Sequence, residues 1–314
     1  MKAVMLKAAG GPENFEVMEI EQPTIKDNEV LVETKGISLN PADIMCKSSD
    51  EMLGMMFDDE RPILLGWDLS GIVKEVGSNV SKFQVGDRVF GMINFPGQGK
   101  TYAEYVAAPE SHLAKIPENT NFIDAAATTL AALTAYQMLK GNIRKGDRVL
   151  VQGGSGGVGH FGIQLAKSMG AYVITTASAD NKDFVMSLGA DEHINYKTQS
   201  FEDAPDIDYV LDIFGGERLI KAIQLVKKGG KVFSTAAPAG PMSEEPTKLA
   251  NEIGVEFSGI LVQSSGDDMQ VLADMLADGS LKANVYATLP LEEMAQAHTE
   301  AAKGNAIGKL VVTV

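Results

Sequence analysis

The stretch from residue 148 to residue 169 constrains the fold of this chain more than any other. Residues 148–152 (RVLVQ) are typical of a buried strand, and residues 157–169 have the pattern of a helix. Between these segments, Gly154, Gly156 and Gly159 satisfy the spacing G-x-G-x-x-G. In such a turn one glycine permits the tight bend, another the approach of a pyrophosphate, and the third close packing of helix on strand. The sequence therefore predicts a dinucleotide site at the start of this helix, and a turn without a ligand is the alternative.

Glycine is enriched here, because six of the 32 glycines lie between Gly153 and Gly162. Two later loops, at residues 212–216 and 235–238, also follow predicted strands and consist mainly of small residues. The carboxyl ends of parallel strands meet at one edge of a sheet, where a dinucleotide binds. The predicted cofactor contacts from these three loops are Gly154, Ser155, Gly156, Gly157, Val158, Gly159, Phe214, Gly215 and Ala236.

The pattern of elements predicts two domains of different type. Short strands separated by turn residues fill the first third of the chain and indicate a small barrel or sandwich. From about residue 122, helices and strands alternate, which favours a doubly wound parallel sheet. The predicted strands are Met1–Leu6, Phe15–Ile20, Val30–Thr34, Gly71–Val76, Arg88–Met92, Tyr102–Val106, Arg148–Gln152, Ala171–Thr176, His193–Asn195, Tyr209–Asp212, Lys231–Ser234, Val255–Val262 and Lys309–Val314. The predicted helices are Ala125–Lys140 with Asp124 as N-cap, Gly157–Met169, Lys182–Leu188, Leu219–Val226, Asp267–Asp278 and Leu291–Lys303.

Charge and cysteine content exclude several functions. The net charge is −15 and no run of basic residues occurs, so binding to nucleic acid or to an anionic membrane surface is not expected. The single cysteine, Cys46, excludes an intrachain disulfide and a zinc cage built from several thiolates. The amino terminus lacks the apolar stretch of a signal peptide, and a cytoplasmic location is expected.

The residues after the second strand of the parallel sheet indicate which nucleotide binds. An acidic residue at the end of this strand normally holds the 2′-hydroxyl of NAD. Here the strand runs into Ala177-Ser178, and Lys182 follows, which suits the 2′-phosphate of NADP. Asp180 is evidence against this choice, and Lys182 could also be an ordinary surface residue of a helix. NADP is favoured.

Several motifs resemble the medium-chain dehydrogenase/reductase superfamily, specifically its zinc-independent quinone oxidoreductase and enone reductase branch. The similarity covers essentially the whole chain. Its motifs are Gly146-Asp147, Gly156-Gly157-Val158-Gly159 with Gln164 and Lys167, Gly71–Gly77, Thr101–Val106, Ser187–Asp191 and Gly308–Val311. Gly154 departs from the pattern, since the family usually has Ser or Ala there.

The resemblance implies a GroES-like catalytic domain of residues 1–122 and 267–314, with a Rossmann domain of residues 123–266 between them. It also implies a homodimer joined through an edge strand, for which Val255–Val262 is the candidate. The places where zinc-dependent relatives carry their catalytic ligands read Leu39–Asp43 and Gly66–Asp68. Neither contains a thiolate or an imidazole, so no metal is expected.

The resemblance further implies individual site residues. Asn40 is expected at the nicotinamide ribose, with Asp43 on the same loop, and these two are the candidate catalytic residues. Thr134 is expected near the nicotinamide and Lys309 among the cofactor-binding residues. The 2′-phosphate pocket is expected to comprise Ser178, Lys182 and Tyr196.

Without zinc to polarise a carbonyl, the substrate has to be electrophilic already. We therefore expect hydride transfer from C4 of NADPH to a quinone or an α,β-unsaturated carbonyl, with the proton supplied by water or by Asp43. The segment Ala177–Asp191 resembles enone reductases, and the methionine-rich segment Met52–Phe57 suits small apolar substrates or simply packs. Two alternatives stay open: a non-catalytic NADPH-binding protein of the crystallin kind and, with less support, a methyltransferase.

Overall fold

A computed structural model describes residues 1–57, 61–199, 206–236 and 244–314 of the chain. The chain forms two compact units, of which unit 1 comprises Met1–Leu133 with Val262–Val314, and unit 2 comprises Thr134–Leu261. The sequence analysis placed the domain boundaries at residues 122/123 and 266/267. The first boundary lies later in the structure because α3 (Phe122–Ala127) packs against five strands of unit 1.

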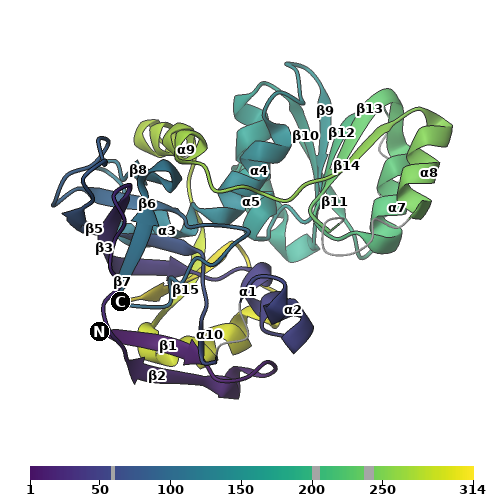
Figure 1. Cartoon of the computed structure of the whole chain (residues 1–314). Coiled ribbons are helices and arrows are strands. Elements are labelled where there is room, and N and C mark those ends of the chain that lie inside the picture. The colour runs from purple at the N-terminus through teal and green to yellow at the C-terminus, as the bar shows by residue number, and fades with distance from the viewer. Residues whose placement is uncertain (58–60, 200–205, 237–243) are drawn as a thin grey trace. The chain divides into compact units, whose positions relative to one another are not determined.

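Unit 1 is built from two sheets (Figure 1). The larger one has the order β15-β16-β3-β5-β6-β8, with β7 also paired to β3, and the smaller one has the order β2-β1-β4. The strands are β1 Lys2–Leu6, β2 Phe15–Glu19, β3 Glu29–Ser38, β4 Ile63–Leu64, β5 Asp68–Val76, β6 Arg88–Met92, β7 Tyr105–Pro109, β8 Leu113–Lys115, β15 Val285–Pro290 and β16 Lys309–Thr313.

Aliphatic side chains from β3, β5, β6 and β7 form the core between these strands, among them Val32, Leu69 and Val89, which are fully buried. The last strand, β16, pairs antiparallel with β3, so both ends of the chain contribute to one sheet. The helices of this unit are α1 Pro41–Cys46, α2 Asp50–Gly54, α3, α9 Gly266–Asp278 and α10 Met294–Ala301, with 3-10 turns at Pro12–Asn14, Glu110–His112 and Leu291–Glu293.

The single helix expected over residues 125–140 is two helices, and the expectation was wrong there. The side chain of Asn121, not of Asp124, caps α3 by accepting a hydrogen bond from the Asp124 N–H. The chain leaves the helical conformation at Thr128 (ψ 39°), and the hydroxyls of Thr128 and Thr129 donate to preceding carbonyls. The second helix, α4 (Leu130–Leu139), follows and is succeeded by Gly141 with φ +72°. Threonine hydroxyls compete in this way for helical carbonyls.

Unit 2 is a parallel sheet with the strand order β11-β10-β9-β12-β13-β14. The elements are β9 Arg148–Val151, α5 Gly157–Ser168, β10 Tyr172–Ala177, a 3-10 turn at Ala179–Asn181, α6 Lys182–Ser187, β11 Glu192–Asn195, β12 Ile207–Asp212, α7 Gly216–Leu225, β13 Val226–Ser234, α8 Glu244–Ile253 and β14 Glu256–Gly259. Apolar residues of α7 and α8 pack on the sheet face formed by Leu150 and Val210, whereas Gly162 of α5 packs against Val151 and Leu211 on the other face. The sheet is therefore covered on both faces (Figure 1).

The strand order has a switch point between β9 and β12. From β9 the chain proceeds outward through β10 to β11, then returns to the other side of β9 and continues through β12, β13 and β14. In open parallel sheets, ligands bind beyond the carboxyl ends of the strands at such a point. The turn between β9 and α5, which carries the glycine motif, begins there.

Candidate cofactor site and a buried polar cluster

The glycines of the β9–α5 turn have distinct roles. Gly153 adopts φ +65°, a conformation that favours glycine. A Cβ on Gly154 would collide with Oγ1 of Thr175 in β10, and one on Gly159 with the carbonyl of Gly153. At Gly156, the N-cap of α5, the nearest atom to such a Cβ is 3.4 Å away. Gly154 and Gly159 are therefore required for packing, whereas Gly156 leaves space beside the backbone.

Hydrogen bonds fix this turn to the end of β10. The N–H of Gly153 donates to the hydroxyl of Thr176, and the N–H of Gly154 donates to the carbonyl of the same residue, both at 2.9 Å. The hydroxyl of Ser155 accepts a hydrogen bond of 3.1 Å from Nδ2 of Asn181, in the turn that precedes α6. Thr176 therefore holds the glycine turn in place, while the hydroxyl of Thr175 donates to the carbonyl of Val151 in β9 at 2.8 Å. From the sequence, both residues were noted only because neither is acidic.

Asp212, at the end of β12, organises the neighbouring loop. Its buried carboxylate accepts the N–H groups of Phe214 (3.3 Å) and Gly215 (3.0 Å) and the hydroxyl of Ser234 (2.6 Å). The N–H of Ala236 in turn donates to the Ser234 hydroxyl at 3.2 Å. Burial raises the pKa of Asp212, and these donors oppose that effect. Sequence reasoning missed this residue, although its place at the end of a buried strand could have indicated it.

The other predicted cofactor residues of unit 2 lie as follows. Ser178 occupies the N-cap position of the 3-10 turn after β10 without a capping hydrogen bond from its side chain, and Lys182 is the exposed first residue of α6. Tyr196 follows β11 and is 46% exposed. Thr134, in α4, is buried. The predicted cofactor residues of the glycine turn and of the two loops of small residues follow β9, β12 and β13 at the same edge of the sheet. Residues 237 and 238 of the last loop lie outside the described residues.

In unit 1, Asn40 lies in a buried polar cluster with Asp68 and Lys309. Nδ2 of Asn40 donates to Oδ2 of Asp68 at 2.8 Å, and Nζ of Lys309 donates to Oδ1 of Asn40 and to the carbonyl of Leu39. Asn40, Asp68 and Lys309 are at most 3% exposed. Oδ1 of Asp68 also accepts the N–H of Leu130 at the start of α4. An ammonium on one side and a carboxylate on the other fix the orientation of the Asn40 amide.

Asp43 lies in the same cluster and is fully buried. Its Oδ2 accepts the backbone N–H of Asn40 at 2.8 Å, while Oδ1 has no hydrogen-bond partner. Burial, followed by the negative charge of Asp68, raises the pKa of Asp43 to about 7. The hydroxyl of Tyr102, whose pKa is itself raised by burial, bonds to Nε2 of His298 at 3.0 Å. Burial lowers the pKa of His298 to about 3, so this imidazole is neutral at physiological pH.

The described residues contain no group of three or more His, Cys, Asp or Glu side chains that could hold a metal ion. Cys46 is buried in α1 with Sγ 4.0 Å from Sδ of Met56, and burial raises its pKa to about 12. It is therefore a packing residue and not a reactive thiolate.

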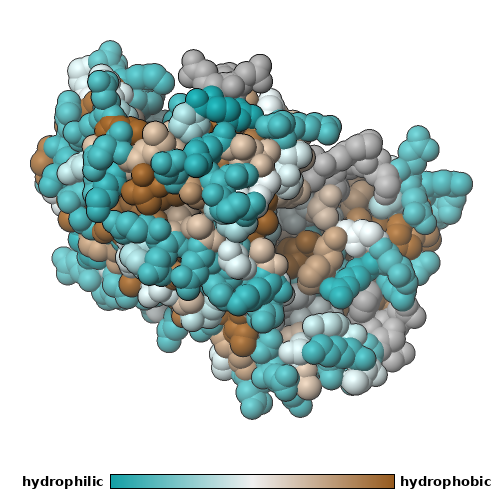
Figure 2. Space-filling model, turned by 90° about the horizontal axis from the view of Figure 1, so that it is seen from below, coloured by the Kyte–Doolittle hydropathy of each residue, from teal (hydrophilic) through white to brown (hydrophobic). Residues whose placement is uncertain are grey.

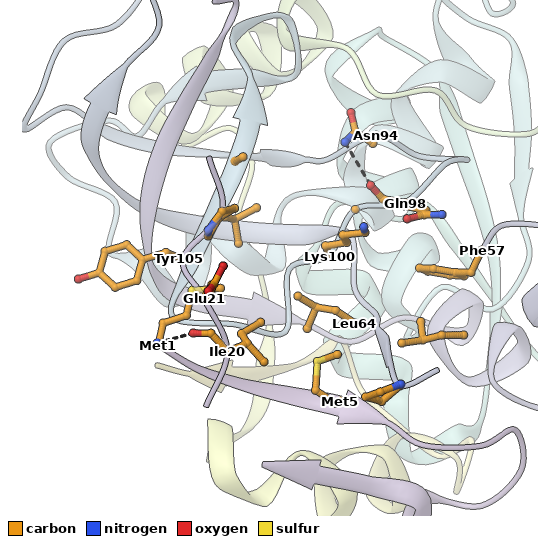
Figure 3. A pocket seen from close by; sticks show the side chains of 16 residues that line it. Met1, Met5, Ile20, Glu21, Phe57, Leu64, Asn94, Gln98, Lys100 and Tyr105 are labelled. Atoms are coloured by element: carbon orange, nitrogen blue, oxygen red, sulfur yellow. Dashed lines mark hydrogen bonds between the residues drawn. The ribbon is translucent and has the colours of Figure 1, made fainter. Parts of the chain in front are cut away.

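The methionine-rich segment partly packs and partly faces solvent. Residues 50–54 form the short helix α2, which begins after Ser49, and Leu53 and Phe57 are buried whereas Met55 is 69% exposed. Phe57 also lines a cavity of about 350 Å³ in unit 1. Figure 3 shows this cavity, with Met5 and Leu64 on one side and the polar Asn94 and Gln98 on the other.

No helix in the described ranges is long and apolar enough to cross a membrane. The face of the molecule in Figure 2 is largely hydrophilic, with apolar side chains in scattered patches.

In this chain, the last strand pairs with β3 in a mostly antiparallel sheet, and the middle forms a parallel sheet with a glycine turn at its switch point. This is the architecture of a two-domain dinucleotide-binding protein. Comparison with known proteins supports this two-domain architecture. Residues 26–118 match the alcohol dehydrogenase GroES-like domain, and residues 188–312 match the zinc-binding dehydrogenase family.

The chain is 34% identical to a 2-methylene-furan-3-one reductase of Solanum lycopersicum, over 95% of this chain and 76% of the relative. It is 32% identical to a chloroplastic NADPH-dependent alkenal/one oxidoreductase of Arabidopsis thaliana, over 99% of this chain and 79% of the relative. The structure of the quinone oxidoreductase from Coxiella burnetii superposes with a TM-score of 0.93 at 33% identity, over 100% and 99% of the two chains.

The chain therefore belongs to the medium-chain dehydrogenase/reductase superfamily, in its quinone oxidoreductase and enone reductase branch. The predicted fold class, a GroES-like β-rich domain with a Rossmann-type parallel sheet, is confirmed. Membership of this branch also argues against a methyltransferase.

Proposed function

We propose that this protein is an NADPH-dependent oxidoreductase that reduces quinones or α,β-unsaturated carbonyl compounds. The observation that carries the proposal is the glycine turn at the switch point of the parallel sheet, with space beside the backbone of Gly156. Its relatives named as alkenal/one, furanone and quinone reductases support the substrate classes.

Unit 2 would hold the cofactor. The turn of Gly154, Ser155, Gly156, Gly157, Val158 and Gly159 would receive the pyrophosphate at the start of α5, where backbone N–H groups lack partners within the helix. Phe214, Gly215 and Ala236 would line the neighbouring loops, and Ser178, Lys182 and Tyr196 would bind the 2′-phosphate. The NADPH-dependent relative supports this choice of nucleotide.

NADPH, when bound, supplies a hydride from its nicotinamide ring. Asn40 would contact the nicotinamide ribose, as the resemblance implies, with Thr134 near the ring. Because the Asn40 amide already donates to Asp68 and to the Ser38 carbonyl, what it offers a ligand is the second lone pair of Oδ1. A ribose hydroxyl that donates fits this acceptor. Asp43 and Lys309 would keep the loop and the amide in place.

Three further properties belong to this proposal. The reduction would be independent of zinc, because Asn40 and Trp67 stand where zinc-dependent relatives carry ligands. The protein would be a homodimer joined through β14, which in the described part of the chain is an edge strand paired with β13. It would act in the cytoplasm.

The test is a fluorescence titration with NADPH and NADH, followed by NADPH oxidation in the presence of 1,4-benzoquinone or 3-buten-2-one. We expect tighter binding of NADPH and turnover of at least one acceptor, unchanged by EDTA. Equal affinity for both nucleotides would disprove the 2′-phosphate pocket. Tight NADPH binding without turnover of either acceptor would instead favour a non-catalytic NADPH-binding protein.

A further inference from the structure

An arginine held by two exposed aromatic rings lies at the carboxyl-end edge of the parallel sheet. Cζ of Arg218, in the first turn of α7, is 4.5 Å from the ring centroid of Phe214 and 5.4 Å from that of Tyr196. The two rings are 45% and 46% exposed. Within the described part of the chain, no carboxylate forms an ion pair with Arg218, although its charge also acts on the nearby Asp212 and opposes the rise in the pKa of that carboxyl.

The strands from which the two rings come place the guanidinium relative to the glycine turn. Phe214 follows β12 and Tyr196 follows β11, and the strand order puts β9 and β10 between them. Adjacent strands are about 4.8 Å apart, so these loops start roughly 14 Å from each other. Since one guanidinium contacts both rings, it lies across the carboxyl ends of β9 and β10.

Two further contacts support this position. Cζ of Phe214 lies only 2.8 Å from where a Cβ on Gly153 would stand, so the ring covers the first glycine of the turn. The N–H of Tyr196 donates to the carbonyl of Ala177, the last residue of β10. Arg218 therefore reaches from the glycine turn towards the segment that carries Ser178 and Lys182.

Contact through the rings leaves the hydrogen-bonding capacity of Arg218 available. A cation–π contact uses the face of the planar guanidinium, whereas its N–H donors point outward in the plane. Two parallel N–H groups of a guanidinium can bind two oxygens of one phosphate, which a lysine ammonium does less well. A chain with a net charge of −15 also needs local cations to attract an anionic cofactor.

We propose that Arg218 is a further specificity-determining residue of the cofactor site, which binds the 2′-phosphate of the adenosine ribose together with Lys182. Tyr196 and Phe214 hold its guanidinium at that position. The inference rests on the proposed NADPH-dependent function and adds a residue that neither the glycine motif nor the family resemblance indicated.

The test uses two adenosine fragments that differ only in the 2′-phosphate, adenosine 2′,5′-bisphosphate and 5′-AMP. Their Kd values are measured by calorimetry for the wild type, Arg218→Gln, Arg218→Lys and Lys221→Gln. The last variant is the matched control, because it removes one positive charge from the same helix at a residue paired with Glu217.

We expect Arg218→Gln to raise the Kd of the bisphosphate about tenfold or more, since hydrogen bonds between charged groups are lost. The Kd of 5′-AMP should stay within twofold, Arg218→Lys should be intermediate, and Lys221→Gln should leave both values within twofold. The inference would be overturned if Arg218→Gln weakened the binding of both fragments equally or of neither. It would also be overturned if Lys221→Gln raised the Kd of the bisphosphate as much as Arg218→Gln does.

These outcomes are distinct from a failure of the proposed function. If the wild type itself binds both fragments equally, the NADP preference is wrong and the role of Arg218 falls with it. If the wild type prefers the bisphosphate and Arg218→Gln keeps that preference, only the role of Arg218 is wrong. Arg218 is exposed, and a melting curve of each variant confirms that it is folded.

Discussion

Lys309 donates a hydrogen bond to the side-chain oxygen of Asn40, 269 residues away in the sequence, inside a cluster of buried polar side chains. The same cluster contains the carboxylates of Asp43 and Asp68, and the ammonium of Lys309 offsets part of their charge. Burial lowers the pKa of Lys309, whereas these two carboxylates raise it. Charge balance in this cluster is therefore as important as hydrogen bonding.

Replacing Lys309 should test that balance. We expect Lys309→Met to lower the free energy of unfolding by about 3–5 kcal/mol, because it leaves buried carboxylates without their cation. Adding Asp68→Asn should restore part of the loss. Lys2→Met, which breaks an exposed ion pair with Glu292, should leave the free energy of unfolding nearly unchanged. Urea denaturation measures all three, and a Lys309→Met variant no less stable than Lys2→Met would contradict the account.

Asp43 should make stability depend on pH. Its pKa in the folded protein, about 7, is higher than the ordinary value of 3.8, so the folded state binds more protons between these two values. The free energy of unfolding should therefore fall as the pH rises from about 4 to 7, by at most about 1.4 kcal/mol per pH unit. Denaturation of wild type and Asp43→Asn across this range measures the effect. The variant should show a flatter dependence, and identical slopes would refute the assignment to Asp43.

Two glycines of the β9–α5 turn should respond differently to alanine. A Cβ at Gly156 would make only an ordinary van der Waals contact, at 3.4 Å, with the carbonyl of Gly153, so Gly156→Ala should leave the melting temperature nearly unchanged. NADPH binding should weaken about tenfold or more, because the methyl group would occupy the proposed position of the pyrophosphate. Gly154→Ala meets Thr175 and should lower the free energy of unfolding by about 1–3 kcal/mol. Thr175→Ala added to Gly154→Ala should recover part of that stability. If Gly156→Ala bound NADPH as well as the wild type, the pyrophosphate would have to bind elsewhere.

Replacing Lys182 should weaken the binding of NADPH and leave the affinity for NADH unchanged. Lys182→Gln removes an exposed ammonium at the start of α6, so the Kd of NADPH should rise several-fold to tenfold. Asp180→Asn, two residues earlier, should tighten NADPH binding slightly by removing a negative charge. Fluorescence titrations with both nucleotides measure these changes. A parallel change in NADH affinity would show that Lys182 does not act on the 2′-phosphate.

The edge strand β14 should determine oligomeric state. Leu261, just beyond it, is 44% exposed, and Leu261→Lys should shift the protein from dimer to monomer because a charged side chain at a strand edge opposes pairing. Val271→Lys, at an exposed apolar position of α9, serves as the control and should remain dimeric. Sedimentation equilibrium distinguishes these states. A wild type that is monomeric at micromolar concentration would refute the proposed dimer.

Local sequence patterns predicted the parallel sheet well, because β9, β10 and β12 are short, largely apolar runs followed by turn residues. They did not predict α8, which is strongly charged, or β15, whose residues alternate weakly. The break at Thr128 depends on side-chain hydrogen bonds that helix propensity does not capture.

The candidate site was only partly predictable for a similar reason. The glycine turn follows from spacing within a few residues, whereas the cluster joins Asn40, Asp68 and Lys309 from three distant parts of the chain. Asp212 and Arg218 act through contacts that only the arrangement of loops at the sheet edge creates.

The central claim is that this protein transfers a hydride from NADPH to an electrophilic acceptor. The most direct measurement uses NADPH deuterated at the transferred position of C4, with 3-buten-2-one as acceptor and mass spectrometry of the product. The account predicts one deuterium on the former β-carbon of 2-butanone. A product without deuterium would contradict it, and so would a lack of turnover of both 3-buten-2-one and 1,4-benzoquinone while NADPH is bound.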